Sequence, residues 1–134
     1  MLLPKHLQRF ADSALIVAAD SVTARCWFAA GDSLEELDGV ALPKETKDGE
    51  GSFEFFPDDT HRLHVFAKQL ATHLTKLERE HKIPHIHLVM PAEVEHLVSK
   101  YLPPDVAANV EIKIHHDVMK EDPLKLVERV LTAR

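Results

Sequence analysis

Residues 15–19 form an uninterrupted apolar run, LIVAA, that ends at Asp20 and Ser21. A strand with one face in water alternates apolar and polar residues, whereas a continuous apolar run of this length is typical of a strand buried on both faces. Such a strand needs packed structure on each side of its sheet. We therefore predict that residues 15–19 are the central strand of a sheet.

Four further strands and three helices are predicted from the apolar periodicity and from the turn residues between segments. The second and third strands follow after short turns, which favours an antiparallel meander. Later strands alternate with helices, and right-handed crossovers would make the last two strands parallel. The further strands are expected at residues 22–29, 34–42, 85–90 and 110–114, and the helices at 59–81, 91–101 and 123–133.

The clearest of these elements is the long helix that begins at Asp59 or Thr60 and ends near His81. Its apolar residues recur at spacings of three and four and so form one stripe along the helix. Pro84 marks its end. The stripe consists of Leu63, Phe66, Ala67, Leu70, Leu74 and Leu77.

The order of the elements, β-β-β-α-β-α-β-α, predicts an α/β fold with a mixed five-stranded sheet and helices on its faces, which is the layout of a ribonuclease-H-like sheet. A length of 134 residues fits one domain. We expect a single domain over residues 1–134, with a core from about residue 13 to 131 and a loop at 44–57.

The loop differs in character from the rest of the chain. Residues 44–52 (KETKDGEGS) are charged, contain two glycines and lack periodicity. The phenylalanines that follow are interpreted as a latch onto the core or as an exposed contact surface. We predict that this loop is a binding element, with Lys44, Lys47, Asp48, Gly49, Glu50, Gly51, Ser52, Phe53 and Phe55 as its binding residues.

The charge balance bears on the kind of partner. The chain has 22 acidic and 16 basic residues, a formal net charge of −6. Nucleic-acid binding gains affinity when Lys and Arg release phosphate counterions, so the overall charge disfavours a free nucleic-acid-binding role and no DNA partner is expected. The first ten residues are too polar for a signal peptide and no apolar run is long enough to span a membrane, so we expect a cytoplasmic protein with no membrane partner.

Cys26 is the only cysteine, so no intramolecular disulfide is expected. It lies in the apolar run Cys26-Trp27-Phe28, which predicts a buried thiol. Arg25 is adjacent in sequence, but its side chain would point to the opposite face of the strand.

Ten histidines raise the question of a metal site. His85 and His87 share a face of one predicted strand, and His115, His116 and Asp117 end the next. Zinc needs three or four converging ligands, and neither an HExxH motif nor paired CxxC motifs occur. We expect partly buried histidines, with no metal, no cofactor and no catalytic residue. The alternative is a metal-dependent hydrolase that uses His87, His115 and Asp117.

Five segments show a pattern of apolar strands and helices: residues 14–20 (ALIVAAD), 23–28 (TARCWF), 62–70 (RLHVFAKQL), 87–91 (HLVMP) and 114–117 (IHHD). Together these segments resemble the middle domain of archaeal and eukaryotic class-1 release factors and their Pelota relatives, and most closely the small bacterial host attachment proteins. The resemblance covers residues from about 13 to 131. In release factors the loop before the long helix carries a Gly-Gly-Gln triplet, which residues 48–52 (DGEGS) lack.

The resemblance implies a release-factor-middle-domain-like fold and an association with the ribosome or a translation factor, without peptidyl-tRNA hydrolysis. Our leading hypothesis is therefore a non-enzymatic binding module. Besides the hydrolase, a second alternative is an interaction protein involved in host attachment. A homodimer could form if the third strand paired with its copy along an exposed edge.

Overall fold

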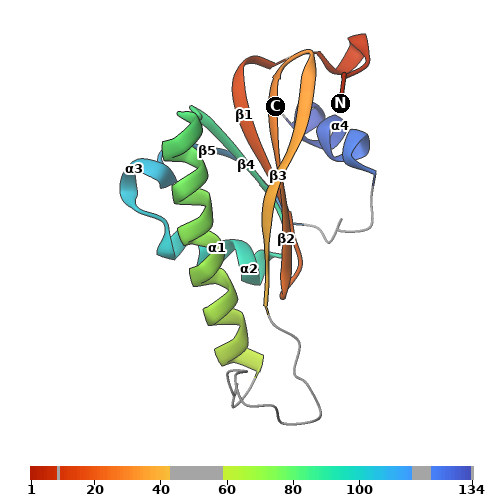
Figure 1. Ribbon diagram of the computed structural model, residues 1–134. Helices are drawn as coiled ribbons and strands as arrows, with labels where there is room; N and C mark the ends of the chain where they lie inside the picture. The colour runs from red at the N-terminus through yellow and green to blue at the C-terminus, as the bar shows by residue number, and fades with distance from the viewer. Residues whose placement is uncertain (9, 43–58, 116–121, 134) are drawn as a thin grey trace.

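The computed structural model describes residues 1–8, 10–42, 59–115 and 122–133 (Figure 1). Its element order contains the predicted β-β-β-α-β-α-β-α series, with two short helical segments added. The elements are η1 (Lys5–Leu7), β1 (Phe10–Ala19), β2 (Thr23–Gly31), β3 (Ser33–Ala41), α1 (Asp59–His81), β4 (His85–Val89), α2 (Ala92–Tyr101), α3 (Pro104–Ala107), β5 (Val110–Ile114) and α4 (Pro123–Ala133).

The five strands form one mixed sheet in the order β3-β2-β1-β4-β5. β1 pairs antiparallel with β2 and parallel with β4, and β2 and β3 complete the antiparallel meander. β4 and β5 are parallel, as the crossover rule predicted. The predicted α/β fold with β1 at the centre of a five-stranded sheet is confirmed.

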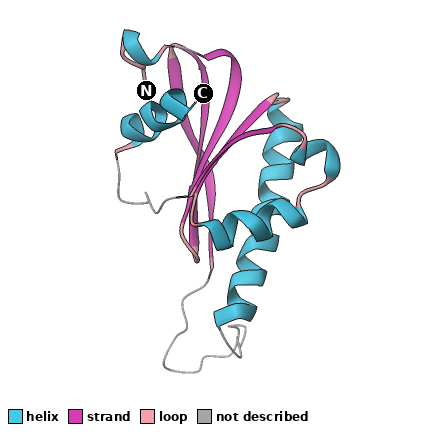
Figure 2. Cartoon of the chain, turned by 180° about the vertical axis from the view of Figure 1, so that it is seen from behind, coloured by secondary structure: helices cyan, strands magenta, loops and turns pink. Residues whose placement is uncertain are grey.

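Both faces of the sheet are covered, which explains the apolar run in β1. Figures 1 and 2 show α1, α2 and α3 on one side of the sheet and α4 on the other. Leu15 and Val17 belong to the core on the α1 side, whereas Ile16 and Ala18 belong to the core on the α4 side. All of residues 15–19 are fully buried, so the prediction of a strand buried on both faces is confirmed.

The long helix α1 has the predicted bounds, and its stripe packs on the sheet. Phe66, Leu70 and Leu74 are fully buried in the α1-side core. The helix ends where Lys82 takes a φ of 52°, a left-handed conformation that commonly stops a helix. Ile83 is buried beyond it, and Pro84 leads into β4.

Two parts of the fold were not predicted, the buried N-terminal segment and the helix α3. The core begins before residue 13, because Leu3 and Leu7 are buried on the α4 side. The N-terminal segment is held there by a hydrogen bond from the Leu3 amide to the Asp32 carbonyl at 2.6 Å. Pro104 starts α3, where a proline is tolerated because the first helical position needs no backbone N–H.

β3 lies at the edge of the sheet, as the homodimer hypothesis required. Its outer side is partly occupied, because Leu2 forms a bridge with Ser33 and the His73 ring nitrogen Nε2 lies 2.6 Å from the Asp38 carbonyl oxygen. Gly39 permits close approach to β2: an added Cβ would lie 2.2 Å from the Ala24 carbonyl oxygen.

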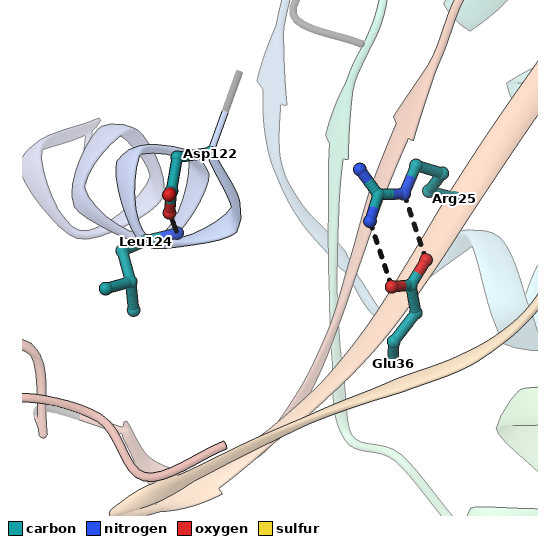
Figure 3. A network of polar contacts seen from close by, with 4 residues as sticks. All are labelled: Arg25, Glu36, Asp122 and Leu124. Atoms are coloured by element: carbon teal, nitrogen blue, oxygen red, sulfur yellow. Dashed lines mark hydrogen bonds and ion pairs between the residues drawn. The ribbon is translucent and has the colours of Figure 1, made fainter. Parts of the chain in front are cut away.

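Two polar contacts fix the strand edge and the last helix (Figure 3). Arg25 on β2 donates two hydrogen bonds to the Glu36 carboxylate on β3, from Nε and from a terminal nitrogen, each 2.9 Å long. This fork lowers the pKa of Glu36 and raises that of Arg25. Asp122 accepts a hydrogen bond from the Leu124 amide at 2.8 Å and so caps the start of α4.

Candidate functional site

The loop predicted to be the binding element lies outside the described residues. Its predicted binding residues were Lys44, Lys47, Asp48, Gly49, Glu50, Gly51, Ser52, Phe53 and Phe55, all within residues 43–58. Their contact role therefore stays a prediction. The described residues that bring chemistry-bearing side chains together lie elsewhere, at the carboxyl ends of β4 and β5.

The parallel strands β4 and β5 end side by side, and α2 begins directly after β4. The Met90 amide donates a hydrogen bond to the Ile114 carbonyl at 2.9 Å, which joins the two strand ends. Pro91 precedes the first residue of α2 and fixes the turn into the helix. Carboxyl ends of neighbouring parallel strands are the usual position of ligand sites in α/β folds.

Glu95 in α2 is the centre of the polar contacts at the carboxyl ends of β4 and β5. Only 2% of its surface is exposed, which is rare for a glutamate without partners. Ser99, one turn later in the same helix, donates a hydrogen bond to Oε2 at 2.5 Å. Nε2 of His115, just beyond β5, lies 2.9 Å from Oε1, and Nζ of Lys113 lies 3.6 Å from Oε2.

His96 completes the group. Its ring lies edge-on to that of His115, with centroids 5.6 Å apart and an angle of 85° between the planes. One ligand atom from each of Glu95, His96 and His115 can be chosen so that all three lie within 4.8 Å of one another. Both histidines are exposed whereas Glu95 is buried. We call these three residues the Glu95 cluster.

The electrostatics of the Glu95 cluster favour an ionised carboxylate. Burial alone would raise the pKa of Glu95, but the hydrogen bonds from Ser99 and His115 and the nearby charges of Lys113 and His96 lower it by more. The pKa of Glu95 is therefore below its ordinary value. At neutral pH the carboxylate is charged, and it is oriented by the Ser99 and His115 contacts.

Of the residues named for the hydrolase alternative, the structure describes His87 and His115, and it does not bring these two together. His87 pairs with Ile112 in the sheet, and Ile112 belongs to the core on the α4 side. His115 contacts Glu95 on the α2 side, which lies on the opposite face of the sheet. The alternative that grouped His87 with His115 is not supported, because side chains alternate between the faces of a strand and these two lie on opposite faces of the sheet. Asp117, the third named residue, lies outside the described residues.

Sequence reasoning missed Glu95 and His96. Both were treated as part of the helix at 91–101, where Val94, Leu97 and Val98 supply the apolar stripe. One sequence signal was present. Glu95 is adjacent to Val94, so a charged residue lies beside the apolar stripe of the helix. Ser99, which carries a hydroxyl, follows one turn later. The contact with His115 depends on strand register and could not be read from spacing.

A second feature is a groove of about 660 Å³ between α1 and β3, which we call the α1 groove. Its lining is basic, although the chain as a whole is acidic. Nζ of Lys68 lies 6.0 Å from the centre of the Tyr101 ring, and Lys76 lies 3.9 Å from Glu80 in the next turn. The lining residues are Val40, Val65, Lys68, Gln69, Thr72, His73 and Lys76.

Cys26 on β2 is fully buried, as predicted. Burial, with a smaller effect of the Glu36 charge, raises the pKa of its thiol to about 12. The reactive thiolate is therefore scarce at neutral pH. We expect a thiol-specific reagent at pH 8 to label Cys26 only in denaturant, which absorbance or mass spectrometry would measure. Rapid labelling of the native protein would contradict the burial of this side chain.

Comparisons with known proteins show what the fold is similar to. No family model matches the chain, and no curated protein sequence matches it. Among solved structures, the archaeal translation termination factor aRF1 is similar with a TM-score of 0.55 and 11% identity, over 90% of this chain and 38% of that one. A structure described as an archaeal protein is similar with a TM-score of 0.52 and 13% identity, over 90% of this chain and 37% of the other.

These likenesses show the fold, and the release-factor-like architecture expected from the sequence is confirmed at that level. The chain spans well under half the length of both of these solved structures. Among the helices that the structure describes, none combines the length and apolarity needed to cross a membrane.

Proposed function

We propose that this domain is a non-enzymatic binding module that associates with the translation machinery and does not hydrolyse peptidyl-tRNA. The observation that carries the proposal is the likeness to an archaeal translation termination factor over 90% of the chain. The stretch that precedes α1, residues 48–52, reads DGEGS and lacks the adjacent glycines and the glutamine of the release-factor triplet.

The groove between α1 and β3 supplies a surface for such a partner. Lys68, His73 and Lys76 line it from one face of α1, at spacings of five and three residues. Positive side chains gain affinity for RNA by releasing the counterions of its phosphates, even when the chain as a whole is acidic. We therefore assign ribosomal RNA as the contact of the α1 groove.

We expect the tagged protein to co-sediment with ribosomes at low salt and to lose this association at moderate salt. The double variant Lys68→Glu/Lys76→Glu reverses two charges in the groove and should remove most of the association. Loss of two phosphate contacts also makes log affinity less steep against log salt, by about 0.9 per contact for duplex nucleic acid and about 0.7 for single strands. Fractionation over a sucrose cushion at several salt concentrations measures both effects.

The matched control is Lys5→Glu/Lys125→Glu, which makes the same charge change at exposed lysines of η1 and α4. This pair should leave co-sedimentation almost unchanged. Deletion of residues 48–52 tests the loop separately and should weaken binding while the fold is retained. Absence of the wild-type protein from every ribosomal fraction at low salt would overturn the proposal, and equal effects of the two double variants would overturn the assignment of the groove.

The host attachment alternative and the homodimer hypothesis have different consequences. A host attachment role requires that protein be found outside the cytoplasm, which cell fractionation measures. Homodimerisation through β3 requires that the Leu2 bridge to Ser33 and the His73 contact with Asp38 leave enough free edge for pairing. We favour the translation-associated module because the partly occupied edge of β3 carries Glu35, Glu36 and Asp38, and such charges oppose pairing with a copy of the same strand.

A further inference from the structure

The Glu95 cluster has the donor set of a transition-metal site. Two imidazoles and one carboxylate are the protein ligands of a common class of zinc site, in which water takes the fourth position. Imidazole nitrogen is a preferred ligand of zinc, and zinc also accepts a carboxylate oxygen as a ligand. The three ligand atoms already lie within 4.8 Å of one another, so small side-chain rotations would bring them around one ion.

The placement of the three residues on the backbone also fits. Glu95 and His96 are consecutive in α2, so their side chains leave the helix about 100° apart. Two such side chains can share an ion only if it lies in the angle between them. His115, at the end of β5, enters that angle: it contacts Glu95 through Nε2 and faces the ring of His96.

We propose that Glu95, His96 and His115 bind one Zn²⁺ ion, with solvent completing its coordination. This site is independent of the translation-associated function. The His115 side chain is 43% exposed, so an ion reaches the cluster from solvent. Bonds of about 2.0 Å in a tetrahedron place neighbouring ligand atoms about 3.3 Å apart. Nε2 of His115 and Oε1 of Glu95 must therefore separate by a few tenths of an ångström from their 2.9 Å contact.

Two neighbours tune this site in opposite directions. Ser99 orients the carboxylate through its hydrogen bond to Oε2, as outer-shell residues do for metal ligands. Lys113 places a positive charge 3.6 Å from the same oxygen and so competes with a cation.

The test is titration of metal-free protein with Zn²⁺ by calorimetry, and with Co²⁺ by visible absorption. We expect one ion per chain and a tetrahedral Co²⁺ spectrum. His96→Ala and His115→Ala should each weaken binding by more than the roughly 10–100-fold typical of losing an outer-shell partner. Ser99→Ala should weaken it less, and Lys113→Met should strengthen it. Both histidines are exposed, so circular dichroism should show native folding in their alanine variants.

The control is His6→Ala, which removes an exposed histidine of η1 and should leave the affinity for Zn²⁺ unchanged. The proposal is overturned if the wild type binds no Zn²⁺, or if His96→Ala and His115→Ala bind it as tightly as the wild type. It is also overturned if several ions bind and all three histidine variants reduce binding equally, because that result describes scattered surface histidines.

Discussion

Replacing Phe66 with alanine is expected to lower the free energy of unfolding by about 3–5 kcal/mol, the usual cost of emptying a buried aromatic site. Phe66 is fully buried in the core between α1 and the sheet. Its neighbours in that core are held by the secondary structure around them and can close the cavity only in part. Urea denaturation followed by circular dichroism would measure the loss.

The control is Val65→Ala, one residue earlier on the same helix, where the side chain is only partly buried and lines the α1 groove. Val65→Ala should lower the free energy of unfolding much less than Phe66→Ala, because fewer contacts are lost and solvent reaches the site. If Phe66→Ala cost no more than Val65→Ala, α1 would not pack on the sheet as described. The lysines of the groove would then lack a rigid support.

Most of the fold could be predicted because a buried strand or helix can be recognised from the apolar pattern of its own residues. The run at residues 15–19 identified the central strand, since only a strand covered on both faces can be apolar at every position. The spacing of the apolar stripe identified α1, and Pro84 marked where that helix had to end. Pro103 and Pro104 show the limit of such signals: a proline that ends one helix can also begin the next, and sequence pattern alone does not separate the two.

The candidate site could be predicted only in part, because it depends on which strands are neighbours and on their register. His115 was identified as the end of a strand with potential ligands, but it was grouped with His87. A shift of one residue changes the face of a strand on which a side chain lies. The register of β4 and β5 puts His87 on the α4 side and His115 beside Glu95. No local pattern contains this information.

The second large effect concerns Ser99→Ala, which removes the donor closest to Glu95. We expect the free energy of unfolding to fall by about 1.5–3 kcal/mol at pH 7, the usual contribution of a hydrogen bond to a charged group. Because the folded pKa of Glu95 lies below its ordinary value of 4.5, the ionised Glu95 carboxylate stabilises the fold above about that pH. This stabilisation is lost as the pH falls through 4.5 toward the lower folded pKa. The difference between variant and wild type should therefore shrink at pH 3, which urea denaturation at both pH values would show.

A matched control separates charge from packing in this experiment. Thr72 in α1 donates its hydroxyl to the Lys68 carbonyl at 3.0 Å, so Thr72→Ala removes a helical hydroxyl that contacts a neutral acceptor. Its effect on stability should be small and the same at both pH values. If Ser99→Ala were equally insensitive to pH, the hydroxyl would act by packing alone. The inference that the Glu95 carboxylate is ionised and is oriented by the hydrogen bond from Ser99 would then be wrong.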